Sequence, residues 1–153
     1  MNKKRLYSLL AAVAIVSMVF ILAFVLNNRL AFEGKIPPDS RTYAKINALV
    51  DEHIHANGVY LLNTEEKHVV YLVLDGSHLS FSNETPRYSE ITIDQTNDKL
   101  TIHLREDWKT FSMKEDSELR LIYRILVDEN IEYVDVYKNG ERSAFDAAIL
   151  SGS

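Results

Sequence analysis

The chain has 153 residues, no cysteine and a formal net charge of −5, so it is long enough for one small domain that folds without disulfide bonds. Residues 35–153 hold 13 Lys and Arg against 21 Asp and Glu, a net charge of −8. Nucleic acids and anionic membrane surfaces attract clustered Lys and Arg, so this balance argues against nucleic-acid binding and against electrostatic membrane adsorption.

The first predicted element is a transmembrane helix at residues 6–26. These 21 residues carry no charge, and at about 1.5 Å per residue they match a hydrocarbon core of about 30 Å. A secretory signal peptide usually has a shorter apolar region, and Arg29, two positions before Ala31, makes the one candidate cleavage site a poor one. We therefore expect an anchor that is retained, with a cleaved signal peptide as the alternative.

The basic residues around this stretch predict its orientation. Lys3, Lys4 and Arg5 precede it, and only Arg29 follows closely. By the positive-inside rule, the N-terminus stays in the cytoplasm and the rest is exported, which predicts a single-pass protein of the cell membrane. The lack of Cys suits a bacterial envelope better than a eukaryotic secretory product. The parts are then a cytoplasmic tail (1–5), a transmembrane anchor (6–26), a linker (27–39) and an extracytoplasmic α+β domain (40–153).

An amphipathic helix is predicted to open the exported domain. Asp39 or Ser40 can cap it, and Gly58 after Asn57 is a usual place for a helix to end. Its apolar positions recur at helical spacing, at Tyr43, Ile46, Leu49, Val50 and Ile54. We expect this stripe to pack on the sheet that follows.

Two hairpins are predicted next. The first turns at the polar residues 63–67, and its second strand, Val69–Leu74, is apolar on both faces and therefore central in the sheet. A polar loop follows at residues 77–87. The second hairpin alternates apolar and polar residues on both sides of Asn97 and Asp98, which predicts one buried face.

The last segments complete the sheet. Residues 118–127 fit both a helix and a strand, and the alternation of apolar residues favours the strand. Asn139 and Gly140 form the strongest turn pattern of the chain, a type I′ hairpin turn. The predicted fold class is α+β: an N-terminal transmembrane helix, then one amphipathic helix packed on an antiparallel β-sheet of six or seven strands.

The order of these segments carries a resemblance. The stretches VVYLVLDG, YSEITIDQTNDKLTIHLRE and LRLIYRILVDENIEYVDVYKNGE, within residues 68–141, are similar to small extracytoplasmic proteins of Gram-positive bacteria and resemble the domain of the PrcB family, protease-complex subunits. The glycine-rich turn of that family before its Tyr strand is absent, because residues 84–88 read ETPRY. The resemblance implies a small β-rich fold and a role in partner binding rather than catalysis.

Residues for catalysis or metal binding are few. His53 and His55 lie two positions apart on the predicted helix, where side chains do not face each other, and two ligands do not make a site. Ser77 and His78 are adjacent but lack the nucleophile-elbow pattern. The paired acidic residues fall at turns, where solvation is the usual explanation. We therefore predict no catalytic residue, no metal and no cofactor.

Three aromatic residues are candidates for partner binding. On the last hairpin, Tyr133 and Tyr137 share one strand face and Val134 and Val136 the other, so one face enters the core and the other is available for docking. Trp108 follows a predicted strand and should begin a loop. We expect it to fold over the sheet edge, with a role as a partner anchor as the alternative.

These observations predict a membrane-anchored extracytoplasmic binding or regulatory module without catalytic activity, whose partner is another envelope protein. One alternative is an accessory or immunity-type membrane protein that acts through its anchor helix, since small residues such as Ala12 could support helix association. An enzyme with a site of scattered residues is a third. The sequence does not indicate a small-molecule ligand.

Overall fold

The computed structural model describes residues 17–18, 32–96, 98–112 and 118–150 of the chain. The chain separates into two compact units, Met1–Leu30 and Ala31–Ser153. Of the first unit only Ser17 and Met18 are described, and both are helical. All the strands described lie in the second unit.

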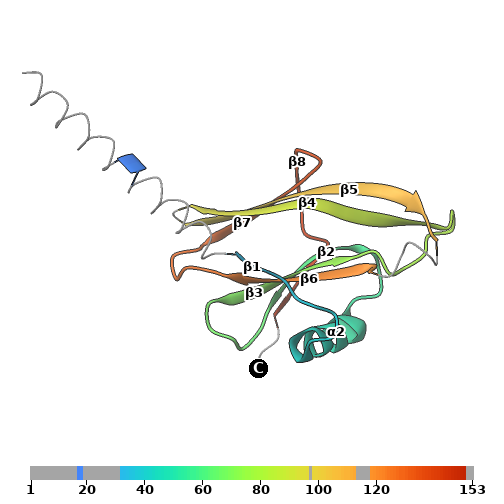
Figure 1. Cartoon of the computed structure of the whole chain (residues 1–153), viewed down its shortest axis with the longest axis horizontal. Helices are drawn as coiled ribbons and strands as arrows, with labels where there is room; N and C mark the ends of the chain where they lie inside the picture. Colours follow the sequence, from blue (N-terminus) through green and yellow to red (C-terminus); the bar gives the residue numbers. More distant parts are fainter. Residues whose placement is uncertain (1–16, 19–31, 97, 113–117, 151–153) are drawn as a thin grey trace, which may run out of the picture. The chain divides into compact units, whose positions relative to one another are not determined.

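The second unit contains two β-sheets and one helix. Sheet A has five strands in the order β1-β6-β3-β2-β9: β1 (Phe32–Lys35), β6 (Arg120–Leu126), β3 (Val69–Asp75), β2 (Gly58–Asn63) and β9 (Ala147–Leu150). Sheet B has four in the order β4-β5-β7-β8: β4 (Glu84–Thr96), β5 (Lys99–Thr110), β7 (Tyr133–Lys138) and β8 (Glu141–Ser143). Figure 1 shows the sheets face to face, with helix α2 (Arg41–His53) on the other side of sheet A.

The predicted fold class is wrong, because these strands form two stacked sheets and not one sheet of six or seven strands. Neither sheet is purely antiparallel: β9 pairs parallel with β2, and β7 pairs parallel with β5. The prediction also included a transmembrane helix. Among the described residues, no helix has the length and apolar character needed to cross a bilayer. The segment assigned to that helix, residues 6–26, lies outside the described residues except for Ser17 and Met18.

Helix α2 begins and ends for local reasons. Ser40 caps it, since its Oγ accepts a hydrogen bond from the backbone N–H of Tyr43 at 3.1 Å. The helix ends at His53, four residues before the predicted end, because the buried Ile54 has an extended backbone that leads toward β2. The predicted stripe packs on sheet A, with Ile46 and Val50 almost fully buried.

Two hydrophobic cores follow from the alternation of side chains in sheet A. The residues that face α2 form one cluster: Tyr60, Leu62, Val69, Tyr71, Val73 and Ile122. The residues that face sheet B form the other: Val59, Leu72, Leu74, Tyr123 and Ile125. Sheet A is therefore buried on both faces, which explains why Val69–Leu74 of β3 is apolar and lies in the middle of its sheet, as predicted.

Several predicted elements are confirmed. Residues 118–127 contain strand β6 and not a helix. Both predicted hairpins form, as β2–β3 and β4–β5, although the loop between them ends at Asn83 because β4 begins at Glu84. Asn139 and Gly140 have φ angles of 55° and 84°, as a type I′ turn requires, and they join β7 to β8.

Strand pairing defines two ends of the second unit. Phe32 lies opposite Ile125, near the last residue of β6, so the chain enters at the end that holds the β2–β3, β4–β5 and β6–β7 connections. We call this the entry end. The far end holds the β3–β4 loop and the last residues of β5, joined by a hydrogen bond from the N–H of Phe111 to the carbonyl of Asn83 at 2.9 Å.

Candidate functional site

The outer face of sheet B, which points away from sheet A, carries the two predicted tyrosines. In β5, Leu100, Ile102 and Leu104 are buried between the sheets, so the alternate residues lie outside. Tyr137 lies opposite His103, and their rings stack with centroids 4.8 Å apart and planes 20° apart. Tyr133 is 58% exposed at the start of the same strand. The valine face is the inner one, since Val136 is only 1% exposed.

An ion-paired carboxylate lies between the two tyrosines. Asp135 is buried although it is on the outer face, because Lys99 binds one of its oxygens and the Arg142 Nη2 donates to the other at 2.6 Å. The hydrogen bond from Lys99 and then that from Arg142 hold the pKa of the Asp135 carboxyl below its usual value. The Asp135 carboxylate in turn raises the pKa of the Lys99 ammonium. The two ion pairs tie β5 and β8 to β7, and the three groups together carry a net charge of +1.

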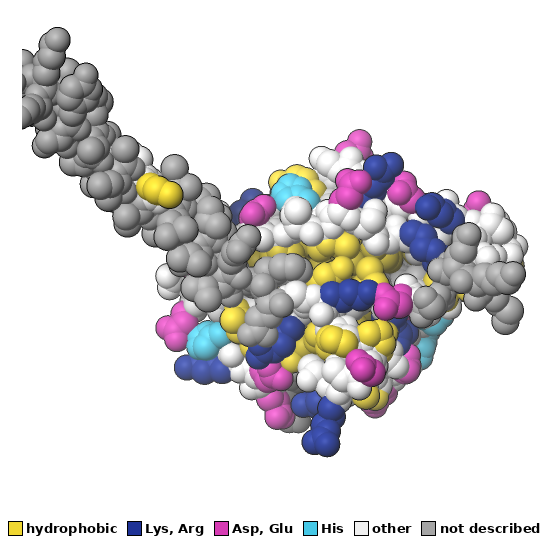
Figure 2. All heavy atoms as spheres, viewed as in Figure 1, with side chains coloured by type: hydrophobic (Ala, Val, Ile, Leu, Met, Phe, Trp, Pro, Cys, Tyr) yellow, Lys and Arg dark blue, Asp and Glu magenta, His cyan; other side chains and the backbone are white. Residues whose placement is uncertain are grey.

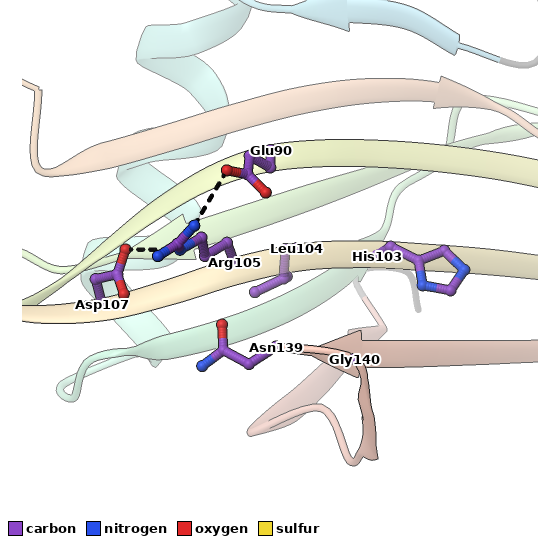
Figure 3. A pocket seen from close by; sticks show the side chains of 7 residues that line it. All are labelled: Glu90, His103, Leu104, Arg105, Asp107, Asn139 and Gly140. Carbon is purple, nitrogen blue, oxygen red and sulfur yellow. Dashed lines mark hydrogen bonds and ion pairs between the residues drawn. The ribbon is translucent and has the colours of Figure 1, made fainter.

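A shallow pocket of about 440 Å³ adjoins His103 on this face (Figure 3). Arg105 lies between two carboxylates, with its Nη1 3.3 Å from Glu90 and its Nε 3.1 Å from Asp107. The amide of Asn139 makes two hydrogen bonds of 2.9 Å to the backbone of Glu106. The polar groups of the pocket are therefore largely bound to one another, and they form a surface ion-pair cluster rather than a set directed at a substrate.

A third surface lies at the far end and consists of Leu79, Phe81 and Trp108. We call it the apolar tip. Leu79 and Trp108 are each 53% exposed and Phe81 is fully exposed. The loop that carries Leu79 and Phe81 is closed by hydrogen bonds between Ser80 and Glu84, and Glu84 pairs with Thr110 of β5. These three make up most of the large hydrophobic side chains exposed among the described residues of the second unit.

The expectation that Trp108 begins a loop is wrong, because it lies within β5 opposite Pro86. Trp108 is 53% exposed, so it is not enclosed at the sheet edge. Trp108 is on the same strand face as Leu104, which points toward sheet A. The neighbouring strand β7 ends opposite Leu104, whereas β5 continues to Thr110, so Trp108 lies beyond the end of β7. The indole Nε1–H donates to the Glu106 carboxylate at 3.0 Å, and about half of the residue is exposed to solvent.

The three predicted residues therefore do not form one site. Tyr133 and Tyr137 share the outer face, as predicted. Trp108 lies nine positions along β5 from Lys99, the partner of Tyr133, which corresponds to roughly 30 Å. The sequence pattern does not identify Leu79 and Phe81, because they are single apolar residues in a Ser-rich segment that is predicted to be a polar loop. An isolated Phe between two serines was the available indication.

The two ends differ in one further respect. At the entry end a cleft of about 620 Å³ opens between the sheets. Its apolar lining residues are Leu61, Val69, Val70, Leu100, Val127, Ile131 and Val134, and its polar ones are Asn63, Lys67, His68, Asp128 and Glu129. Figure 2 shows hydrophobic side chains in a band between the sheets, and positive and negative side chains interspersed over the rest of that face.

The polar residues near Ser77 serve the fold. Arg120, with 9% of its side chain exposed, donates to the fully buried Asp75 carboxylate through Nη2 at 2.7 Å and Nε at 3.1 Å. Its Nη1 bonds Asp51 at 2.7 Å and Asn47 at 2.6 Å, which ties α2 to sheet A. His78 Nε2 lies 3.9 Å from Asp75, too far for a hydrogen bond, and is not bonded to Ser77 in the structure.

The remaining histidines do not bring ligands together. Among the described residues, no group of three or more His, Cys, Asp or Glu side chains is arranged to hold a metal ion. Comparison with models of protein families finds no match, and comparisons with curated proteins and with solved structures find none. The resemblance to the PrcB family stays a prediction.

Proposed function

We propose that this protein is an extracytoplasmic, non-catalytic binding module at the cell membrane, and that its apolar tip docks on another envelope protein. One observation carries the proposal: Leu79, Phe81 and Trp108 stand exposed at the same end of a folded unit. Large apolar side chains held in solvent cost free energy, and grouped ones mark interaction sites. Trp and other aromatic residues are also enriched among the residues that dominate binding energy.

The tip lies at the far end of the second unit, away from the entry end at which β1 begins. The mixed charges of the surface and the net charge of −8 in residues 35–153 favour a protein partner over a nucleic acid.

Site-directed photocrosslinking in intact cells tests the proposal. A photoreactive amino acid placed at position 81 of the full chain should capture one defined protein. The same residue at position 143, exposed on β8, is the matched control and should not capture it. Trp108→Ala should reduce capture from position 81, because it removes a neighbouring anchor without touching either core. Equal capture from both positions, or capture unaffected by Trp108→Ala, would contradict the proposal.

A further inference from the structure

The cleft at the entry end is an unfilled part of the core between the sheets. Four of its apolar side chains come from sheet A or the segment that follows it, and three come from sheet B and its connection: Leu61, Val69, Val70 and Val127, then Leu100, Ile131 and Val134. Leu100 and Val69 are buried, and the other five are partly buried. Further along the sheets, described residues of the same rows, such as Leu72, Leu74, Ile102 and Leu104, are buried in the core between the sheets.

The wall of the cleft selects the kind of ligand. A volume of about 620 Å³ lies within the range of small-molecule sites, roughly 300–1,000 Å³. All seven apolar side chains are branched aliphatic ones, and the one aromatic ring among the lining residues is the imidazole of His68 at the rim. Such a wall matches a flexible methylene chain, whose transfer from water is driven by the hydrophobic effect.

The rim carries both signs of charge. Lys67 is exposed and has no ion-pair partner among the residues that the structure describes, while His68 Nε2 lies 3.3 Å from the Glu129 carboxylate. Asp128 is exposed beside Glu129. The rim therefore offers an ammonium group for a phosphate and carboxylates for an amine, which is the charge pattern complementary to a zwitterionic headgroup.

The proposed location connects the cleft to a lipid source. The cleft lies at the entry end of the second unit, where Phe32 pairs with Ile125. A protein at the cell membrane, as proposed above, is in contact with phospholipids. The inference rests on that part of the proposed function.

We propose that the cleft binds one acyl chain of a zwitterionic membrane phospholipid, with the chain between the sheets, the phosphate at Lys67 and the amine at Asp128. The chain completes the core that the protein leaves open. The headgroup remains at the rim, in solvent or at the membrane surface.

Photolabelling of the full chain in vesicles tests the proposal. The vesicles contain a phosphatidylethanolamine probe with a photoreactive group near the end of one acyl chain. Peptides that contain Leu61–Val70 and residues 127–134 should carry the label. Lys67→Glu, at an exposed turn away from both cores, and Val134→Trp, which fills the cleft, should each lower this labelling by roughly tenfold, a loss of about 1.4 kcal/mol. Lys109→Glu and Thr92→Trp, exposed elsewhere, are the matched controls and should leave it unchanged.

The outcomes separate the alternatives. Absence of label from the cleft peptides, or labelling unaffected by both Lys67→Glu and Val134→Trp, overturns the proposal. Equal labelling by a phosphatidylglycerol probe, which has no amine, overturns the assignment of the headgroup. Crosslinks between two chains at the cleft would show a second copy as its occupant. Loss of lipid labelling with capture from position 81 intact leaves the protein-binding function standing.

Discussion

Replacement of Arg120 by Met should be among the most destabilising single changes outside the apolar cores. The Asp75 carboxylate is fully buried, and Arg120 donates two hydrogen bonds to it. Arg120→Met keeps the length of the side chain but leaves that carboxylate without its charged partner. Removal of one member of a buried ion pair costs about 3–5 kcal/mol. A small domain has a total stability of about 5–15 kcal/mol, so the loss is a large share.

Arg124 offers a matched control on the same strand face. It pairs with Glu66, but the side chains are 27% and 45% exposed, so Arg124→Met should cost only about 0–1 kcal/mol. The change to Asp75→Asn in the Arg120→Met background removes the unpaired charge and should recover part of the loss.

Pulse proteolysis of the full chain in urea measures these differences. With a slope of about 2 kcal/mol/M, the Arg120→Met variant should unfold at a urea concentration lower by about 2 M. The Arg124→Met midpoint should move by less than about 0.5 M. If the two variants unfold at the same urea concentration, burial does not make the Arg120–Asp75 pair contribute more to the free energy of unfolding than the Arg124–Glu66 pair, and the reasoning is refuted.

Two further predictions concern sheet B. Gly140→Val should destabilise the domain by about 1–3 kcal/mol in the same assay, because Gly140 has φ 84°. No atom lies within 4 Å of a Cβ added at this position, so Gly140→Ala should isolate the cost of backbone strain. An unchanged urea midpoint for Gly140→Val would contradict this prediction. The Asp135 carboxyl has a lowered pKa, so its contribution to stability is present above about pH 3.9, the unfolded value, and is lost as the pH falls through the folded value. NMR titration should show the pKa of Asp135 rising toward its ordinary value in Lys99→Met, and a pKa that does not move would exclude Lys99 as the main cause.

Much of the local structure could be predicted because short-range patterns decide it. The cap at Ser40, the alternation in β3 and β6 and the turn at Asn139 and Gly140 depend on residues a few positions apart, and each appears where it was predicted. The two faces of β7 were also separated correctly, since alternation alone places Tyr133 and Tyr137 together.

The candidate site could be predicted only in part. The pattern of β7 allows either the tyrosine face or the valine face to pack against sheet A. Only the tertiary structure shows that Val136 is buried and Tyr133 exposed. The exposure of Trp108 depended on β5 running past the end of β7, a difference in length between strands distant in sequence. Leu79 and Phe81 became part of a surface only because their loop folds back to the same end as Trp108.

The sequence by itself indicated helix α2, the segments of strands β2 to β8, the turns and the acidic character of the domain, because these follow from composition and from periods of two and 3.6 residues. It did not indicate β1, which lies within the predicted linker 27–39, or β9. Only the tertiary structure decided that the strands divide between two sheets and that β7 joins β5 in parallel. Pairing between strands that are far apart in the sequence depends on which apolar faces can be buried together. The pattern of one strand shows that a face is apolar but does not show which other face it packs against. The apolar tip and the open cleft exist only after that choice, since each is assembled from residues at one end of several strands.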